Sequence, residues 1–138
     1  MRAVVQRVSS GSVSVNGQEV SRIGPGMVVL LGVTHGDGRE EAERLASKLL
    51  KLRIFEDDTG RMNEALGDRE ILCISQFTLY SDTKSGNRPG FKDAAPGEVA
   101  EPLYETVCDL LGARRGVFGA DMKVDIGGDG PVTILIEV

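Results

Sequence analysis

The stretch ILCISQFTLY, residues 71–80, begins with four apolar residues and then brings hydroxyl and amide side chains close together. Ser75, Gln76, Thr78 and Tyr80 follow where a buried strand is expected to end. Strand ends are where α/β proteins commonly place catalytic groups. A hydroxyl at such a point could attack an ester or amide as a nucleophile, or it could position a substrate and a water molecule.

A nucleophilic hydroxyl needs a general base within hydrogen-bond reach. The only histidine of the chain is His35, in a loop far from this stretch in sequence. One histidine also excludes a histidine-rich zinc site, and the acids near His35 are better explained by the start of a helix, so we expect no metal. Near Thr78 the sequence offers no base apart from distant His35 or a loop acid. Both interpretations of the hydroxyls, as a nucleophile or as positioning groups, therefore stay open.

The surrounding elements predict one domain, residues 1–138, with a mixed α/β fold. We expect a layered, largely antiparallel and barrel-like sheet covered by two main helices. Apolar residues recur at helical spacing in two segments, 40–52 and 98–111. Apolar or alternating runs predict strands at 2–8, 12–15, 19–23, 27–33, 53–55, 71–77, 122–126 and 132–138.

A long loop with little apolar content, residues 81–97, leaves directly from the polar stretch. Loops of this length in compact domains are usually functional or disordered. Its cations Lys84, Arg88 and Lys92 could be solvated charges, or they could contact an anionic end of a substrate. Arg7 interrupts a mostly apolar strand, so it either has fixed partners in the interior or lies on an outer face.

The net charge of −5 argues against a broad, sequence-independent grip on nucleic acid. It leaves room for a site that takes one nucleic-acid end through a few contacts. The longest apolar run, residues 27–33, is far shorter than the ~20 residues of a membrane span, and because the first residues lack a continuous apolar segment we expect no export signal. Cys73 and Cys108 lie inside apolar patterns, which is typical of reduced core cysteines in a cytoplasmic protein.

Two motifs, SQFTLY at 75–80 and DGPVT at 129–133, resemble those of the D-aminoacyl-tRNA deacylase (D-tyrosyl-tRNA(Tyr) deacylase) family. The likeness runs essentially end to end and includes MRAVVQRV, GMVVLLGVTHGD, LRIFEDDTGRMN, GNRPGF and FGADMKV in family order. The resemblance implies hydrolysis of the ester that joins a D-amino acid to tRNA, without a metal or a cofactor. It also implies a cytoplasmic homodimer, with no role for a membrane, whose active sites lie at the subunit interface and take the acceptor end of aminoacyl-tRNA.

The resemblance assigns site residues as well. In the family the Ser-Gln strand end lines the pocket, and the matching residues here are Ser75, Gln76, Phe77 and Thr78. A Gly-cis-Pro pair from the partner subunit acts as a chiral filter that rejects L-aminoacyl esters, and it corresponds to Gly130 and Pro131. Arg7 matches the arginine that helps to hold this turn. Gly128 stands where the family usually has Asn, and glycine lacks the side chain that can pin such a turn by hydrogen bonding.

The expected substrate carries its own 2′-hydroxyl on the terminal adenosine, and this group can orient or activate the attacking water. We therefore interpret Ser75 and Thr78 as positioning groups, with backbone N–H groups near Phe77 as oxyanion donors. Covalent catalysis by Thr78 is the alternative mechanism. A non-catalytic dimeric module that binds tRNA ends or nucleotides is the alternative function. Because the filter works by excluding a side chain, glycyl-tRNA is expected to be hydrolysed too.

Overall fold

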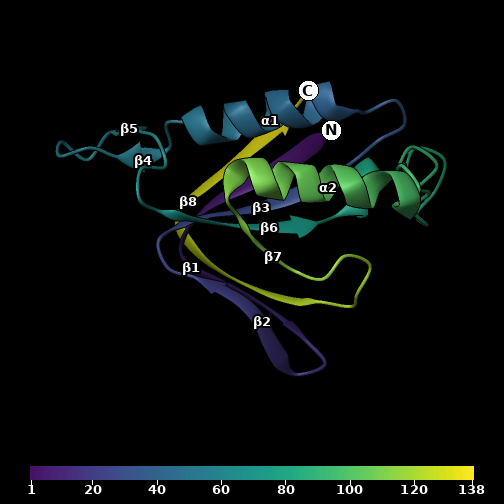
Figure 1. Cartoon of the computed structure of the whole chain (residues 1–138), viewed down its shortest axis with the longest axis horizontal. Helices are drawn as coiled ribbons and strands as arrows, with labels where there is room; N and C mark the ends of the chain where they lie inside the picture. Colours follow the sequence, from purple (N-terminus) through teal and green to yellow (C-terminus); the bar gives the residue numbers. More distant parts are fainter.

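The computed structural model describes all 138 residues of the chain. It is a curled sheet with two long helices on one side (Figure 1), which confirms the predicted mixed α/β architecture. The helices are α1 (Arg39–Lys51) and α2 (Gly97–Leu111), and Phe77–Tyr80 form a short 3₁₀ helix, η1. The strands are β1 (Arg2–Val15), β2 (Gln18–Ile23), β3 (Gly26–Gly32), β4 (Phe55–Glu56), β5 (Met62–Glu64), β6 (Glu70–Ser75), β7 (Arg114–Arg115) and β8 (Lys123–Glu137).

The long strand β1 organises the sheet. On one edge it pairs antiparallel with β3 and then with β2, and on its other edge it pairs antiparallel with β8 along most of its length. Strand β6 lies parallel to β3, and the short β7 lies parallel to β6. Strands β4 and β5 form a separate two-stranded ribbon. The sheet is therefore largely antiparallel, as predicted, with a parallel strand that leads to the polar stretch of the sequence.

Strands β1 and β8 are each longer than predicted. Each joins two predicted strands into one continuous strand, and shifts in the β1–β8 register mark where the pair bends. Gly11 lies in the bent part of β1, and a Cβ atom there would be 2.8 Å from Cγ2 of Val28. Gly11 is thus needed because the strands approach closely here, and not because the chain turns. The position of a glycine in the sequence does not by itself separate these two reasons.

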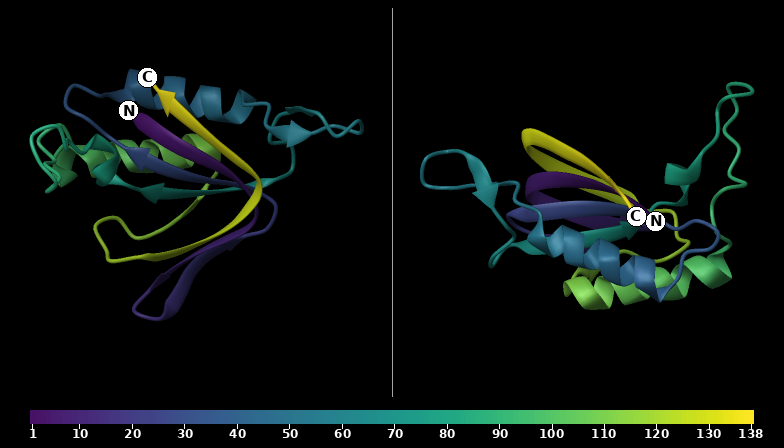
Figure 2. Two further views of the ribbon diagram at one scale, coloured as in Figure 1. Left: turned by 180° about the vertical axis from the view of Figure 1, so that it is seen from behind. Right: turned by 90° about the horizontal axis from the view of Figure 1, so that it is seen from above.

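Both helices cover the same face of the sheet, and the main core lies between helices and sheet (Figures 1 and 2). The predicted apolar stripe of α1 is confirmed, because Ala42, Leu45, Ala46 and Leu49 are all buried. Helix α2 adds Tyr104, Val107 and Cys108, among other buried residues. Burying each large apolar side chain is worth about 1.5–3 kcal/mol, so this layer fixes where the ends of β3 and β6 lie.

A smaller apolar core fills the inside of the curled sheet. Its buried members are Val8, Val13, Ile23, Val28, Leu72 and Ile74. Met122 and Val124, around the start of β8, pack against it. Strand β6 therefore contacts apolar side chains on both faces, which explains why its sequence is a continuous apolar run rather than an alternating one.

Tyr104 links helix α2 to strand β6, since its buried hydroxyl donates to the carbonyl oxygen of Cys73 at 2.8 Å. Replacing Tyr104 with Phe is expected to lower the free energy of unfolding by about 1–3 kcal/mol, because a buried carbonyl loses a partner. The control is Thr106→Val, which removes an exposed hydrogen bond to the Pro102 carbonyl and should change stability by less than about 0.5 kcal/mol. Urea denaturation followed by circular dichroism measures both, and equal effects would contradict a specific role for the Tyr104 hydroxyl.

Candidate active site

Strand β6 ends at Ser75, two residues earlier than predicted. The N–H of Gln76 still donates to the Leu31 carbonyl at 2.7 Å, so Gln76 stays beside β3. The chain then turns into η1, which begins at Phe77. A helix leaves the N–H groups of its first residues without partners inside the helix, so the N–H groups of Phe77 and Thr78 are such donors at the end of β6.

A cavity of about 540 Å³ opens at this end of the sheet. Ser75, Gln76 and Phe77 form part of its wall, and the rest of the wall is mostly apolar. The remaining lining residues are Leu31, Val33, Ile74, Phe91, Ala94, Ala95, Gly97, Ala100, Phe118, Gly119, Ala120, Met122 and Val124. An apolar cavity with a few polar groups at one point is the usual form of a small-molecule site.

Two aromatic rings stand partly exposed at the cavity. Phe77 is 55% exposed and Phe91 is 37% exposed, although both are large apolar residues. Their rings meet edge to face, with centroids 5.0 Å apart. Exposed aromatic faces of this kind can accept a flat ring such as a nucleobase by stacking.

The hydroxyl of Thr78 has an amide as its side-chain partner. The Gln76 side-chain nitrogen donates to Thr78 Oγ1, and Thr78 is not part of the cavity lining. The imidazole of His35 lies elsewhere, where Nε2 hydrogen bonds to the Lys92 carbonyl at 2.8 Å. An amide is not a base at neutral pH, so this arrangement gives Thr78 no group that could remove its proton.

Tyr80, the last hydroxyl of the stretch, lies outside the cavity lining. Its ring is buried, and the guanidinium of Arg2 stacks over it at 4.4 Å from the ring centroid. Burial, together with the nearby carboxylate of Asp37, raises the pKa of Tyr80 to about 12. The phenol therefore stays protonated at neutral pH, and Tyr80 anchors η1 rather than acting as a base.

The Gly130–Pro131 peptide bond is cis, as the resemblance implies. Gly130 has φ +123°, which L side chains rarely adopt. A Cβ atom at Gly130 would also lie 2.9 Å from Cγ2 of Val132 and 3.0 Å from Nη2 of Arg7. Both the backbone conformation and the lack of space therefore require glycine at this position.

Arg7 holds this turn from the interior. Its side chain is only 6% exposed, which decides between the two alternatives left by the sequence. Nη1 donates to the Ile54 carbonyl at 2.9 Å, and Nε donates to the Asp129 carbonyl at 3.2 Å. The carboxylates of Asp129 and Glu56 lie 3.2 Å and 3.8 Å from the guanidinium. Although Gly128 cannot pin the turn, Arg7 restrains the neighbouring Asp129 through both its backbone and its side chain.

The sequence-predicted site residues form two separate groups in one chain. Arg7 pairs with Met27 of β3, whereas the N–H of Gln76 meets Leu31, four residues farther along the same strand. At the rise of a β-strand this is a separation of about 13 Å. No residue of the Gly-Pro turn lines the cavity.

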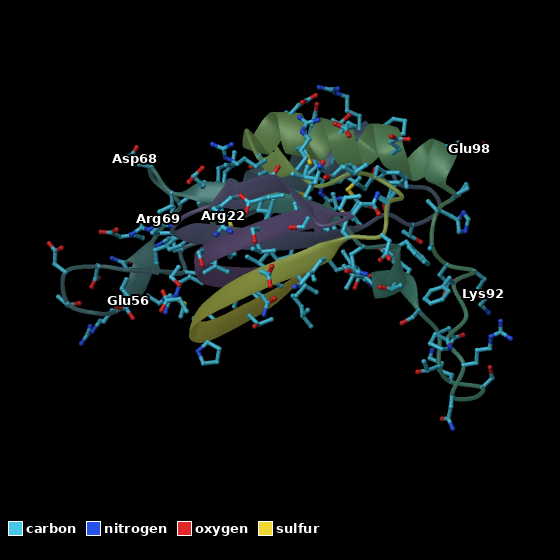
Figure 3. All side chains as sticks on the ribbon, turned by 90° about the horizontal axis from the view of Figure 1, so that it is seen from below. Arg22, Glu56, Asp68, Arg69, Lys92 and Glu98 are labelled. Carbon is cyan, nitrogen blue, oxygen red and sulfur yellow. The ribbon has the colours of Figure 1, made fainter.

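Figure 3 shows the same separation from below. Glu56, which contacts Arg7, lies at the opposite end of the molecule from Lys92, which follows the cavity residue Phe91. The structure therefore brings Ser75, Gln76 and Phe77 together at the cavity and leaves the Gly-Pro turn at a distance.

Most of the cavity wall was missed by sequence reasoning. It comes from the end of the loop before α2, whose cations alone were given a possible role, and from the first turns of α2 and residues 118–124, to which no role was assigned. The available signal was the pair Phe91 and Phe118, which are isolated aromatic residues in polar, glycine-containing segments. Single apolar residues on a surface are common, so this signal gains meaning only after folding brings both rings to one cavity.

Other reactive groups do not converge on the cavity. Cys73 and Cys108 are free and buried, as predicted. A hydrogen bond with Cys108 and complete burial raise the pKa of the Cys73 thiol well above its usual value. No three His, Cys, Asp or Glu side chains are placed to hold one metal ion. No helix is long and apolar enough to cross a membrane.

The chain matches the family model described as D-Tyr-tRNA(Tyr) deacylase over residues 4–137. It is 50% identical to a D-aminoacyl-tRNA deacylase of Carboxydothermus hydrogenoformans, with all of both chains covered. It is 54% identical to a D-aminoacyl-tRNA deacylase of Anaeromyxobacter dehalogenans, covering 99% of this chain and 97% of the relative.

Two solved structures share the fold. One, described as c-Myc DNA Unwinding Element Binding Protein, superimposes with a TM-score of 0.93 and 43% identity over 100% of this chain and 99% of that chain. The other, described as a probable eukaryotic D-amino acid tRNA deacylase, gives a TM-score of 0.84 at 17% identity over 99% and 98% of the two chains, and it bears on the fold alone. The match across nearly the whole length confirms the resemblance seen in SQFTLY and DGPVT: the chain belongs to the D-Tyr-tRNA(Tyr) deacylase family.

Proposed function

We propose that this chain hydrolyses the ester bond between a D-amino acid and the 3′ end of tRNA. The attacking water oxygen bonds to the ester carbonyl carbon, the bond to the ribose oxygen breaks, and that oxygen takes a proton. Free D-amino acid and tRNA are released. The observation that carries the proposal is the apolar cavity with Ser75, Gln76 and Phe77 in its wall, in a chain about half identical to proteins named D-aminoacyl-tRNA deacylase.

The cavity suits the terminal nucleoside of tRNA. A volume of about 540 Å³ lies within the range of small-ligand sites, roughly 300–1,000 Å³. The exposed rings of Phe77 and Phe91 offer stacking faces, and Ser75 and Gln76 offer polar contacts near the ester. We take residues 1–138 as one domain that carries this site, and its substrate places the reaction in the cytoplasm.

In the proposed mechanism the protein positions the ester and the tRNA supplies the activating hydroxyl. The Gln76 amide is hydrogen-bonded to the Thr78 hydroxyl, so this pair does not form a nucleophile beside a general base. The first N–H groups of η1 can stabilise the negative charge that develops on the carbonyl oxygen. The 2′-hydroxyl of the terminal adenosine can then orient the attacking water without help from a side-chain base.

We propose further that the complete site contains two chains. In one chain the β3 partner of Arg7, which holds the Gly-Pro turn, lies about 13 Å along the strand from the β3 partner of Gln76, and no residue of the turn lines the cavity. In a symmetric homodimer each turn can reach the partner's cavity, and both sites form together. There the turn fills the space that an L side chain needs, while D-aminoacyl and glycyl esters fit.

A non-catalytic nucleic-acid-binding protein is the second candidate. The solved structure at 43% identity, which is described as a DNA-unwinding-element binding protein, favours it. The net charge of −5 speaks against a broad duplex-binding surface, because such binding depends on many Lys and Arg contacts.

Ester loss from charged tRNA separates the two candidates. We expect rapid release of the amino acid from D-tyrosyl-tRNA and from glycyl-tRNA, and at least a thousandfold slower release from L-tyrosyl-tRNA, which corresponds to about 4 kcal/mol. Acid precipitation of labelled aminoacyl-tRNA over time measures all three. No loss above the buffer rate from any of them would leave only the binding function.

Thr78→Ala is expected to keep kcat/KM within about tenfold of the unmodified protein, a change of about 1.4 kcal/mol in the barrier. Replacing the 2′-hydroxyl of the terminal adenosine with hydrogen should cost more, on the order of 100-fold or above, because it removes the activating group. Single-turnover kinetics on both substrates measure these effects. Isolation of an aminoacyl ester on Thr78, by acid quench and mass spectrometry, would show covalent catalysis instead.

Two inactive variants should complement each other. Gln76→Ala removes an amide from the cavity wall, and Gly130→Ala blocks the turn through φ +123° and the contact with Val132. Co-expressed with different tags, the two chains are expected to form mixed dimers with one intact site, near twice 14.8 kDa by light scattering. Random pairing gives about one quarter of the unmodified activity, since half of the dimers carry one of two sites. Purified mixed dimers without activity would place both groups of residues in the same chain's site.

A further inference from the structure

A projecting arm, residues Ser81–Asp93, leaves the molecule next to the cavity (Figures 2 and 3). Its base is closed by two backbone hydrogen bonds between Asp82 and Gly90, at 2.8 Å and 2.9 Å. Its returning end is fixed by His35, whose ring nitrogen hydrogen bonds to the Lys92 carbonyl at 2.8 Å. The arm therefore has a defined position relative to the cavity, and this gives the single histidine of the chain a structural role.

The arm carries three cations that form no ion pair within the chain. Lys84, Arg88 and Lys92 are exposed, and none of them forms an ion pair with a carboxylate of the chain. Elsewhere most arginines are paired, for example Arg22 with Glu19 at 2.8 Å. The arm also contains the acids Asp82 and Asp93, so its net charge is +1 (three cations less two acids) in a chain whose net charge is −5, and a polyanion is attracted to such a cationic segment.

The arm and the cavity share a wall. Phe91 of the arm lines the cavity and contacts the ring of Phe77, and Lys92 is the next residue. Helix α2 begins at Gly97, which also lines the cavity, and carries the exposed acid Glu98 at the same end of the molecule as Lys92 (Figure 3). A nucleic-acid strand that leaves the cavity beside Phe91 therefore meets the cations of the arm directly, whereas the start of α2 presents an acid.

Resting on the function proposed above, we infer that the arm binds the backbone phosphates of the unpaired nucleotides that precede the terminal adenosine. Lys84, Arg88 and Lys92 supply the contacts. Such contacts hold a strand in register but read no base, so they suit a protein that must accept many tRNAs. The arm then recognises the nucleic-acid part of the substrate, while the cavity recognises its last nucleoside and the amino acid.

A second unpaired basic group provides the matched control. Arg44, Lys48 and Lys51 lie on α1, and none of them forms an ion pair. The C-terminal half of α1 points toward β4 and β5, at the end of the molecule opposite the arm (Figures 1 and 2). It has the same number of charges but lies away from the cavity of its own chain.

The test uses a triple variant, Lys84→Gln with Arg88→Gln and Lys92→Gln, and two substrates that carry the same ester. On D-tyrosyl-tRNA we expect kcat/KM to fall about 10- to 100-fold through KM, and the slope of log(kcat/KM) against log[salt] to weaken by about 2, as three lost phosphate contacts on a single strand predict. On 3′-O-(D-tyrosyl)adenosine, which has no phosphate, the variant should stay within twofold of the unmodified protein. The α1 triple variant, Arg44→Gln with Lys48→Gln and Lys51→Gln, should leave both substrates within about threefold.

Three results would overturn the inference: equal losses on both substrates, equal losses from the two triple variants, or an unchanged salt dependence. The adenosine ester also separates this inference from the proposed function. If the unmodified protein cleaves neither substrate, the deacylase function fails. Filter binding of uncharged tRNA to the two triple variants then still decides whether the arm is the phosphate contact, since only the arm variant should lose affinity.

Discussion

The buried guanidinium of Arg7 is the constraint on which the arrangement of this molecule depends. A cation that is removed from water must have all its donors satisfied, or it destabilises the fold. Here carbonyl oxygens of Ile54 and Asp129 accept from it, and two carboxylates lie close by. Arg7 and these partners come from three parts of the chain that are distant in sequence. Burial of one charge therefore fixes the strand β1, the segment before β4 and the turn within β8 relative to one another.

The curled sheet places the second part of the site by different means. Strand β6 is held by apolar contacts on both faces, from the main core and from the core inside the curl. Such a strand has little freedom to shift, because either face would lose packing. The polar residues Ser75 and Gln76 begin where this double packing ends. The cavity is thus positioned by apolar burial and the turn by a buried charge, at two ends of one sheet.

The sequence predicted the elements best where periodicity is strong. The apolar stripe of α1 and the continuous apolar run of β6 follow directly from residue spacing. The end of β6 did not, because Phe77 continues an alternating pattern while the backbone has already turned into η1. Arg7 illustrates a different difficulty: one arginine in an apolar strand is equally consistent with an exposed or a buried side chain, and only tertiary partners decide. The cavity wall was unpredictable because its residues come from segments that meet only after folding.

The proposed rejection of L-aminoacyl esters by steric exclusion places a demand on the rigidity of the turn. A thousandfold preference corresponds to about 4 kcal/mol, so a turn that can yield at lower cost cannot provide it. The usual family solution, an Asn two residues before the Gly-Pro pair, is absent here, and Gly128 adds backbone freedom. The long-range contact that remains is the one from Arg7, the residue that matches the family arginine, to the backbone and the carboxylate of Asp129. Because Arg7 is itself fixed by Ile54 from outside the turn, the rigidity of the turn is set by the whole sheet rather than by its own sequence.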